Sequence, residues 1–307
     1  MHKGVAGGTR GVVSFGVVED RSMNKTIELL IIDPQNDFCD LPGDWCPTNP
    51  VTGQTWSPAL PVAGAHADML RLAALIREGA RGISAITVTL DSHHRFDIAH
   101  PTFWKTRDGE AVTPFTPITA AQVRSGDFAP QDAAMLPRAL DYLDELERRG
   151  RYTLMVWPVH CEIGSWGHNV HPAVKAAYNA WEDRHLALAR KVNKGSNPWT
   201  EHYSALQAEV PDHDDELTQL NTALIASLDR NDIVVIAGEA SSHCVRATTE
   251  HLVDNLPSRQ ADKVVLLTDC MSPVGGFEAQ HNAFLDAMAH RGVRLMSSSE
   301  MGNLLSN

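Results

Sequence analysis

Short, almost wholly apolar segments alternate with longer segments of helical apolar periodicity through most of this 307-residue chain. The clearest apolar segment is Ile27–Ile32, which ends at Asp33-Pro34. A strand that is apolar on both faces is typically covered by helices on both faces. Regular alternation of strands and helices predicts a mostly parallel sheet between two helical layers. The expected fold class is therefore α/β, in three layers of the αβα type.

The remaining predicted elements follow one another along the chain. Further strands are expected at residues 83–90, 152–157, 186–192, 232–237 and 263–268. Helices are expected at residues 66–78, 136–149, 172–184, 217–228, 244–255 and 278–291. Residues 101–131 and 195–215 show little periodicity, and such long loops usually serve a function in a compact domain. We expect one domain over residues 23–307, with these two segments as insertions that cover a pocket, preceded by a flexible N-terminal extension of residues 1–22.

Charge and cysteine usage limit the partners and the compartment. The formal net charge is −12, which argues against nucleic acids and anionic membranes, because both bind basic surfaces. No apolar run approaches the roughly 20 residues of a membrane span. The five cysteines are an odd number without disulfide-framework spacing, which favours a reducing compartment. We expect a cytoplasmic homo-oligomer that acts on a small molecule, with no nucleic-acid or membrane partner.

Polar residues with chemical potential follow several of the predicted strands. Ligands of open α/β sheets bind beyond the carboxyl ends of the strands, so these positions indicate the site. One edge of the sheet would collect a carboxylate, a lysine, a thiol and a group of histidines with an aspartate. The residues are Asp33, Asp91, His93, His160, Lys194 and Cys244.

Cys244 lies where a predicted strand turns into a helix. A helix N-terminus stabilises a thiolate, and its free N–H groups can hold an oxyanion. Cys244 is therefore either a nucleophile or a buried small apolar residue. Asp33 either takes the proton of the thiol or shapes the turn before Pro34. Lys194 either lowers the pKa of the thiol or is an exposed loop lysine.

Asp91, His93 and the later His160 are of the residue types that bind zinc, manganese or iron. Three protein ligands leave open positions for water or substrate, as a functional metal requires. The alternative is that Asp91 and His93 are ordinary polar loop residues. Nearby histidines without an assigned ligand role are His94, His100 and His168.

Taken together, five sequence blocks resemble the isochorismatase-like cysteine hydrolases, and within them the nicotinamidases. The blocks are residues 29–38 (LLIIDPQNDF), 91–93 (DSH), 157–161 (WPVHC), 194–195 (KG) and 238–245 (GEASSHCV). Two departures stand out, since nicotinamidases usually carry Thr-Asp at Ser241-Ser242 and a small apolar residue at Glu239.

The resemblance implies a Rossmann-like fold and specific roles for residues of this chain. It implies a catalytic triad of Asp33, Lys194 and Cys244. It also implies an oxyanion hole formed by the backbone N–H groups of Ala240 and Cys244, with a cis peptide bond between Glu239 and Ala240. The metal ligands that it implies are Asp91, His93 and His160.

The activity implied is that of a metal-containing cysteine amidohydrolase. Such an enzyme would cleave a small carboxamide of nicotinamide type, a C–N bond other than a peptide bond, through a thioester on Cys244. The products would be the carboxylate and ammonia. One divalent metal ion is expected, zinc first, with manganese or iron as alternatives. Two other functions stay open: hydrolysis of a ureido, carbamoyl or other linear amide by the same triad, and a catalytically silent binding protein.

Overall fold

A six-stranded sheet forms the centre of the structure, a computed structural model that describes Met1 and residues 25–306. All neighbouring strands in it are parallel, in the order β10-β9-β8-β1-β2-β7. The predicted N-terminal extension comprises residues 1–22. Except for Met1, these residues are outside the described part of the chain. The strands of this sheet are β1 (Ile27–Ile32), β2 (Ala85–Asp91), β7 (Arg190–Lys194), β8 (Ile233–Gly238), β9 (Val264–Leu267) and β10 (Arg294–Met296).

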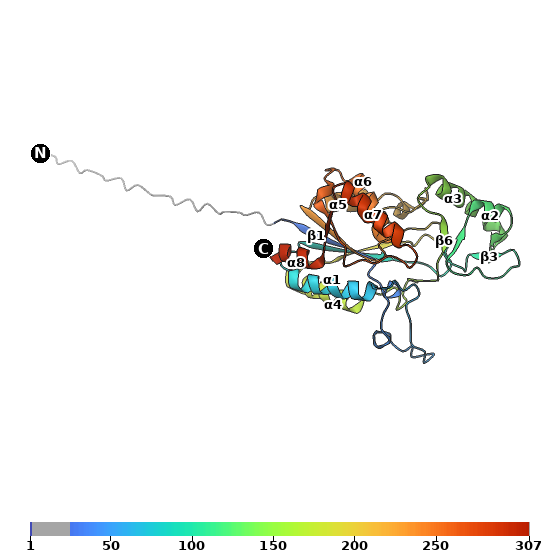
Figure 1. The fold of residues 1–307 in the computed structure, drawn as a ribbon, viewed down its shortest axis with the longest axis horizontal. Coiled ribbons are helices and arrows are strands. Elements are labelled where there is room, and N and C mark those ends of the chain that lie inside the picture. Colours follow the sequence, from blue (N-terminus) through green and yellow to red (C-terminus); the bar gives the residue numbers. More distant parts are fainter. Residues whose placement is uncertain (2–24, 307) are drawn as a thin grey trace.

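Helices cover both faces of this sheet, which confirms the predicted three-layer αβα fold. Figure 1 shows α1, α4 and α8 on one face and α5, α6 and α7 on the other. In the described residues, no helix has the length and apolarity needed to cross a membrane. The helices of these layers are α1 (Ala65–Gly79), α4 (Pro172–His185), α5 (Thr222–Asp229), α6 (Cys244–Asn255), α7 (Glu278–His290) and α8 (Ser298–Ser306).

A smaller lobe lies beyond the carboxyl ends of the central strands (Figure 1). In it, β3 pairs antiparallel with β5, and β4 pairs antiparallel with β6. The predicted strand at residues 152–157 thus exists in shortened form as β6, but outside the central sheet. Residues 101–131 carry short elements that are too brief to show periodicity. The elements of the whole lobe are β3 (Trp104–Thr106), β4 (Thr116–Ile118), α2 (Ala120–Arg124), β5 (Phe128–Pro130), α3 (Leu136–Arg149) and β6 (Leu154–Val156).

Two predicted boundaries are wrong for identifiable reasons. The strand expected at residues 186–192 begins only at Arg190, because Leu186 is the left-handed end of α4 with a φ of 50°. The helix expected from Leu217 begins at Thr222, where the Asn221 side chain accepts a hydrogen bond from the N–H of Leu224. Residues 25–306 also contain five short 3-10 helices that were not expected; they are Asn36–Phe38, Gly43–Trp45, Ala133–Met135, Glu216–Thr218 and Ala261–Lys263.

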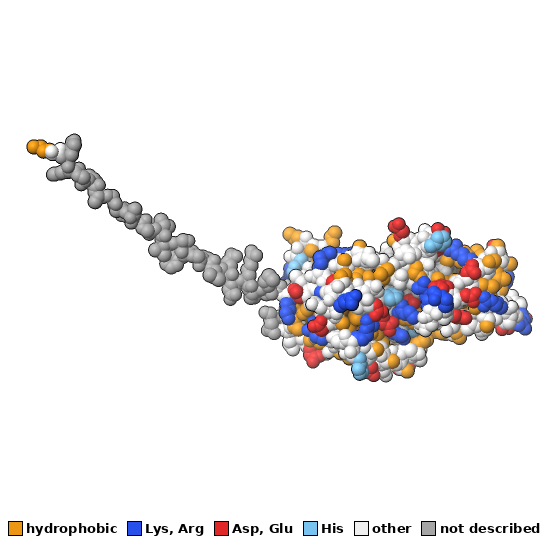
Figure 2. All heavy atoms as spheres, turned by 90° about the horizontal axis from the view of Figure 1, so that it is seen from above, with side chains coloured by type: hydrophobic (Ala, Val, Ile, Leu, Met, Phe, Trp, Pro, Cys, Tyr) orange, Lys and Arg blue, Asp and Glu red, His pale blue; other side chains and the backbone are white. Residues whose placement is uncertain are grey.

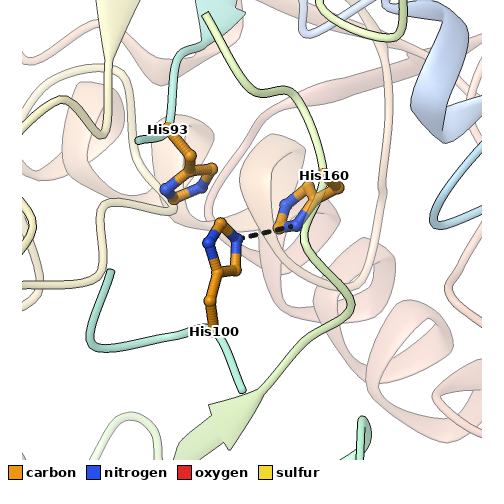
Figure 3. A group of neighbouring side chains, drawn as sticks. All are labelled: His93, His100 and His160. Carbon is orange, nitrogen blue, oxygen red and sulfur yellow. Dashed lines mark hydrogen bonds between the residues drawn. The ribbon is translucent and has the colours of Figure 1, made fainter. Parts of the chain in front are cut away.

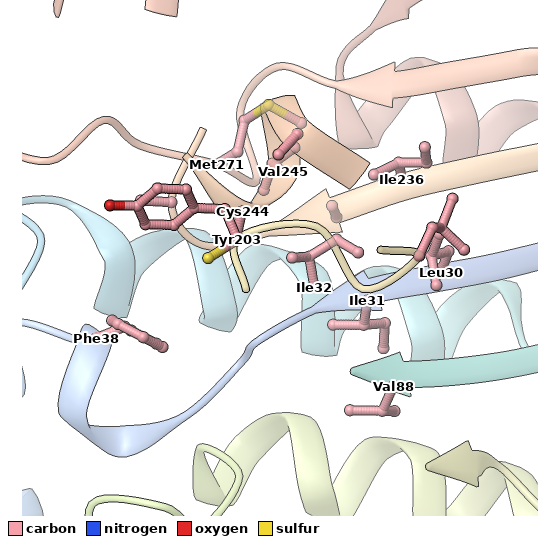
Figure 4. Close-up of a cluster of buried hydrophobic side chains, with 14 of the residues drawn as sticks. Leu30, Ile31, Ile32, Phe38, Val88, Tyr203, Ile236, Cys244, Val245 and Met271 are labelled. Atoms are coloured by element: carbon pink, nitrogen blue, oxygen red, sulfur yellow. The ribbon is translucent and has the colours of Figure 1, made fainter. Parts of the chain in front are cut away.

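The buried core places the site at one edge of the sheet. Every residue of β1 is buried, and β8 lies directly beside it. At Gly238 the two strands approach so closely that a Cβ would lie 1.9 Å from the carbonyl oxygen of Ile32, and the φ of 123° also favours glycine. Figure 4 shows Cys244 beyond the carboxyl ends of these strands, at the border of the apolar cluster.

The surface seen in Figure 2 carries acidic and basic side chains interspersed with one another. On this face they do not separate into one positive and one negative region. Charge is therefore not what marks a binding region there, and the site is defined by the buried residues at the strand ends.

Candidate active site

Lys194, the last residue of β7, is the point where the predicted catalytic side chains meet. Its Nζ lies 3.0 Å from Asp33 Oδ2 and 3.6 Å from Cys244 Sγ. It also donates hydrogen bonds of 2.9 Å to Asp91 Oδ1 and to the carbonyl oxygen of His202. Burial lowers the pKa of Lys194, but the two carboxylates outweigh it and raise this pKa well above its ordinary value. A buried, permanently charged ammonium therefore stands beside the thiol.

Asp33 is held by its neighbour in the sheet. Thr89 of β2 donates from Oγ1 to Asp33 Oδ1 over 2.5 Å and accepts the backbone N–H of Asp33 over 3.0 Å. Burial is the main reason that the pKa of Asp33 is raised, and Lys194 opposes this effect. A carboxylate with a raised pKa is a better proton acceptor than an exposed aspartate.

Cys244 is the first residue of α6, as expected. Burial raises the pKa of its thiol well above the ordinary value, while Lys194 lowers it. Asp33, Asp91 and a hydrogen bond to Asp33 raise this pKa further. Lys194 lowers the pKa of the thiol, as expected, but burial raises it by more. The thiol carries its proton at rest and needs a base.

The turn before Cys244 offers backbone donors. The peptide bond between Glu239 and Ala240 is cis, as the resemblance implied. Ala240 and Cys244 both line the cavity in front of the thiol. Among residues 25–306, no acceptor faces the N–H group of Ala240 or of Cys244. Free N–H groups beside a nucleophile are what an oxyanion hole requires.

Two histidines converge on the second oxygen of Asp91. Asp91 Oδ2 lies 3.1 Å from His93 Nε2 and 3.4 Å from His160 Nε2. The other ring nitrogens face acceptors: His93 Nδ1 lies 3.0 Å from Asp97 Oδ2, and His160 Nδ1 lies 2.8 Å from the carbonyl oxygen of Pro158. An Nδ1–H donated to such acceptors leaves Nε2 with its lone pair, the form that binds metals. The predicted ligand set fits a divalent metal.

His100, to which the sequence assigned no ligand role, joins this group. Its Nε2 lies 3.3 Å from His160 Nδ1, and Figure 3 shows the three buried rings of His93, His100 and His160 facing one another. One potential ligand atom from each lies within 4.8 Å of the others. Burial lowers the pKa of His100 to about 2, so its ring is neutral. His100 is therefore a further candidate ligand.

The cavity in front of Cys244 has largely aromatic and apolar walls. Glu201 and Tyr203 come from the predicted insertion at residues 195–215, whereas none of the lining residues comes from residues 101–131. Apolar and aromatic walls with a few convergent polar groups are typical of small-molecule sites. The walls are formed by Phe38, Leu60, Trp157, Tyr203, His243 and Val274, with Asp91, His160 and Glu201 as polar members.

Solved structures with this arrangement of layers are known. The yeast nicotinamidase bound to the inhibitor nicotinaldehyde superposes with a TM-score of 0.58 at 18% identity, covering 89% of this chain and 100% of that one. An Acinetobacter baumanii nicotinamidase and pyrazinamidase gives 0.58 at 18% identity, covering 91% and 99%. A protein of L. infantum in complex with nicotinate gives 0.53 at 21% identity, covering 90% and 94%. The chain has the nicotinamidase fold. No family model and no curated protein matches the sequence.

Within this nicotinamidase fold, His160 reaches the site by a route that the sequence did not predict. We expected it to follow a neighbouring strand of the central sheet, but β6 belongs to the smaller lobe. Instead, the segment after β6 runs beside His93. The N–H of His93 donates to the carbonyl oxygen of Cys161 over 3.0 Å. The N–H of Ile163 donates to the carbonyl oxygen of His93, also over 3.0 Å. These bonds fix His160 next to His93.

The sequence analysis assigned no role to four other residues of the site. Thr89 could have been found, because a buried polar residue two positions before Asp91 lies on the same face of the strand. Asp97 follows His93 by four residues and carried no such signal. His100 and Glu201 lie in loops whose path sequence patterns do not predict.

Proposed function

We propose that this protein is a cysteine amidohydrolase that cleaves a small aromatic carboxamide of nicotinamide type. The observation that carries the proposal is the position of the buried Lys194 ammonium, in contact with both Asp33 and the Cys244 thiol. A thiol, a carboxylate and a lysine that meet in a buried cavity have the composition of an activated nucleophile. The shared fold with nicotinamidases agrees with this chemistry.

The walls of the cavity support an aromatic substrate. Trp157 and Tyr203 flank His243, with ring centroids 5.2 and 5.1 Å from that of the histidine. Phe38 lies across the site, where its ring meets His160 edge-on at 5.4 Å. Flat rings of this kind pack best against another flat ring. We therefore favour a pyridine-like or pyrazine-like carboxamide over an aliphatic one.

Acylation begins with proton transfer from Cys244 to Asp33. The sulfur forms a bond to the carbonyl carbon, and the N–H groups of Ala240 and Cys244 hold the oxyanion that develops. Lys194 keeps its charge and stabilises the negative charge that passes between thiol and carboxylate. The C–N bond then breaks, and the nitrogen takes the proton from Asp33 and leaves as ammonia.

Deacylation uses the same residues in reverse. Asp33 accepts a proton from a water molecule, whose oxygen attacks the thioester carbon. The oxyanion forms again in the same hole. When the C–S bond breaks, the sulfur recovers the proton from Asp33, and the carboxylic acid product ionises and leaves. Each residue ends in the state in which it began.

Asp91, His93 and His160, with His100 as a further candidate, would hold the divalent metal ion. When bound, such an ion supplies a coordination position for a ring nitrogen or for a water molecule. Asp91 and His160 belong to the cavity walls, so an ion held by them would lie beside the cavity. We propose zinc, with manganese or iron as alternatives, since the ligands are imidazoles and a carboxylate.

The test is ammonia release from nicotinamide, pyrazinamide and a ureido acid by wild-type protein and by Cys244→Ala. We expect turnover of the aromatic amides and a loss of at least a thousandfold in Cys244→Ala. The matched control is Cys46→Ala, a free thiol outside the cavity, which is expected to keep wild-type turnover within twofold. Mass spectrometry of a rapidly quenched reaction is expected to show the acyl group on residues 238–246.

The alternatives give different results in the same assay. Hydrolysis of the ureido acid alone would transfer the assignment to linear amides. Retention of a tenth of wild-type turnover by Cys244→Ala would exclude the thioester. Binding of nicotinamide without any ammonia release would indicate a catalytically silent binding protein.

A further inference from the structure

Residues 239–244 form the turn that carries the N–H groups of Ala240 and Cys244, and we call it the oxyanion turn. A pair of buried acidic groups lies behind this turn and takes no part in the proposed reaction. Glu239, the residue before Ala240, is fully buried, and Asp68 of α1 is 3% exposed. A glutamate at this position is also where the sequence departs from nicotinamidases. Buried carboxyl groups are costly unless they are paired or protonated.

The two carboxyl groups are tied together through Ser272. The N–H of Ser272 donates to Glu239 Oε2 over 3.0 Å, and its hydroxyl donates to Asp68 Oδ2 over 2.6 Å. The carbonyl oxygen of Ser272 accepts the N–H of Ser241 over 2.9 Å. Ser272 thus connects α1 to the turn that carries Ala240 and Cys244.

A proton is needed between the two acids. Glu239 Oε1 is buried, and among the described residues no donor faces it. Glu239 and Asp68 both accept hydrogen bonds from Ser272, and two buried carboxyl groups held this close together favour the state in which one of them carries a proton. Arg71 donates to the other oxygen of Asp68, whereas Oε1 of Glu239 has no partner among the described residues. The proton therefore belongs to Glu239.

We propose that Glu239 is a positioning residue that holds the oxyanion turn through a proton shared with Asp68, and that loss of this proton ends activity at alkaline pH. Two buried negative charges in contact would repel each other and release Ser272 and, with it, Ser241. The N–H groups of Ala240 and Cys244 would then leave the positions that the oxyanion requires. The part of the proposal that concerns activity rests on the proposed function.

The surroundings of the pair agree with a single proton. Burial and Asp68 raise the pKa of Glu239 well above its ordinary value, and Asp40 adds to this. The nearby thiol of Cys39 has a pKa raised by burial. On α7, His281 faces the turn through a 2.7 Å contact with Ser241 Oγ, and burial lowers the pKa of its ring. Apart from Arg71, which contacts the far oxygen of Asp68, these neighbours are uncharged or negative, so they favour the protonated acid.

The test compares Glu239→Gln and Glu239→Leu with wild type and with Glu110→Gln, a surface control. Glutamine can donate to Asp68 and accept from Ser272 but cannot ionise. We expect Glu239→Gln to keep kcat within twofold at pH 7 and to extend the plateau of kcat at least one pH unit further into the alkaline range. Glu239→Leu is expected to lower kcat about a hundredfold, the scale of one lost oxyanion donor, with KM changed less than threefold.

A second measurement does not depend on turnover. The free energy of unfolding of the wild type is expected to fall as the pH rises through the pKa of Glu239, because the folded protein binds the extra proton. This fall is expected to be absent in Glu239→Gln. Coinciding alkaline limbs of wild type and Glu239→Gln, in both kcat and stability, would overturn the proposal. If no amide is hydrolysed at all, the pH dependence of stability still shows whether Glu239 carries the extra proton. If Glu239→Leu does not fold, the comparison of wild type with Glu239→Gln still tests the proposal.

Discussion

Asp91 serves both halves of the site, with one carboxylate oxygen for each. Oδ1 accepts from Lys194, and Oδ2 faces His93 and His160. The group that holds the ammonium beside Cys244 is therefore the same group that would hold a metal ion. A substitution of Asp91 would disturb both functions at once, so effects of such a variant cannot be assigned to either one.

The protonation of Glu209 makes the free energy of unfolding depend on pH. Burial raises its pKa to about 7, and Glu209 Oε1 has no partner among the described residues. The folded protein therefore binds more protons than the unfolded chain between pH 4.5 and 7, and stability falls as the pH rises through this window. We predict that Glu209→Gln removes this loss of stability. Its expected size is about 3 kcal/mol, because a shift of one pKa unit corresponds to about 1.36 kcal/mol.

Urea unfolding at pH 5 and pH 8 measures the effect. The control is Glu216→Gln, an exposed glutamate, which is expected to leave the pH dependence of the wild type unchanged. Equal losses between the two pH values in wild type and Glu209→Gln would show that Glu209 is ionised throughout.

Among the elements, those with strong local signals were predicted well. The bounds of α3 and α6 agree with the prediction, since α3 has a clear apolar face and ends at the left-handed Gly150. The strand at residues 186–192 was misplaced because Leu186 and Leu188 look like strand residues, although both are almost fully exposed. β10 and α8 were missed, because both are short and β10 is not fully buried.

The site shows the same limit. The sequence blocks identified the candidate site residues. That Asp33 and Cys244 both contact Lys194 depends on β7 lying beside β2 and on β8 lying beside β1. Strand order is a property of long-range packing, which local periodicity does not contain. The positions of His100 and Glu201 could not be predicted for the same reason, because contacts with residues distant in the sequence hold their loops in place.

The missed helix α8 leads to a prediction about stability. Its Met301 is completely buried, and Leu305 packs so closely on α1 that a Cβ at Gly79 would lie 2.4 Å from the Leu305 side chain. We predict that Met301→Ala lowers the free energy of unfolding by 2–5 kcal/mol, the range found when a buried methionine is truncated. Urea unfolding is the measurement, and the exposed Asn303→Ala is the control, for which we expect less than about 0.5 kcal/mol.

At the scale of the whole molecule, the metal is expected to add stability without being needed for folding. The core is large, so the apo protein is predicted to fold. Bound metal at a hundred times its Kd would add about 2.7 kcal/mol. We predict about one metal ion per chain by elemental analysis, a lower Tm after chelation, and loss of the ion in the double variant His93→Ala with His160→Ala.

The control for this experiment is His94→Ala, because His94 is exposed and directly follows a proposed ligand. It is expected to keep both the metal and the Tm. Metal retained by the double variant would place the ion elsewhere. The cytoplasmic location and the homo-oligomeric state stay predictions, and light scattering of the purified protein measures the latter.

The order of the strands has a consequence for how the protein is made. Of two neighbouring strands in the described residues, β1 is synthesised about 200 residues before β8. At roughly 5–20 residues per second, the edge of β1 waits about 10–40 s for its partner. During this time a strand that is apolar except for Glu28 has one unpaired edge, which is a template for pairing between chains. Synthesis of this protein therefore leaves one edge of β1 exposed until β8 has been made, and a chaperone that shields residues 27–32 would raise the yield of folded chains.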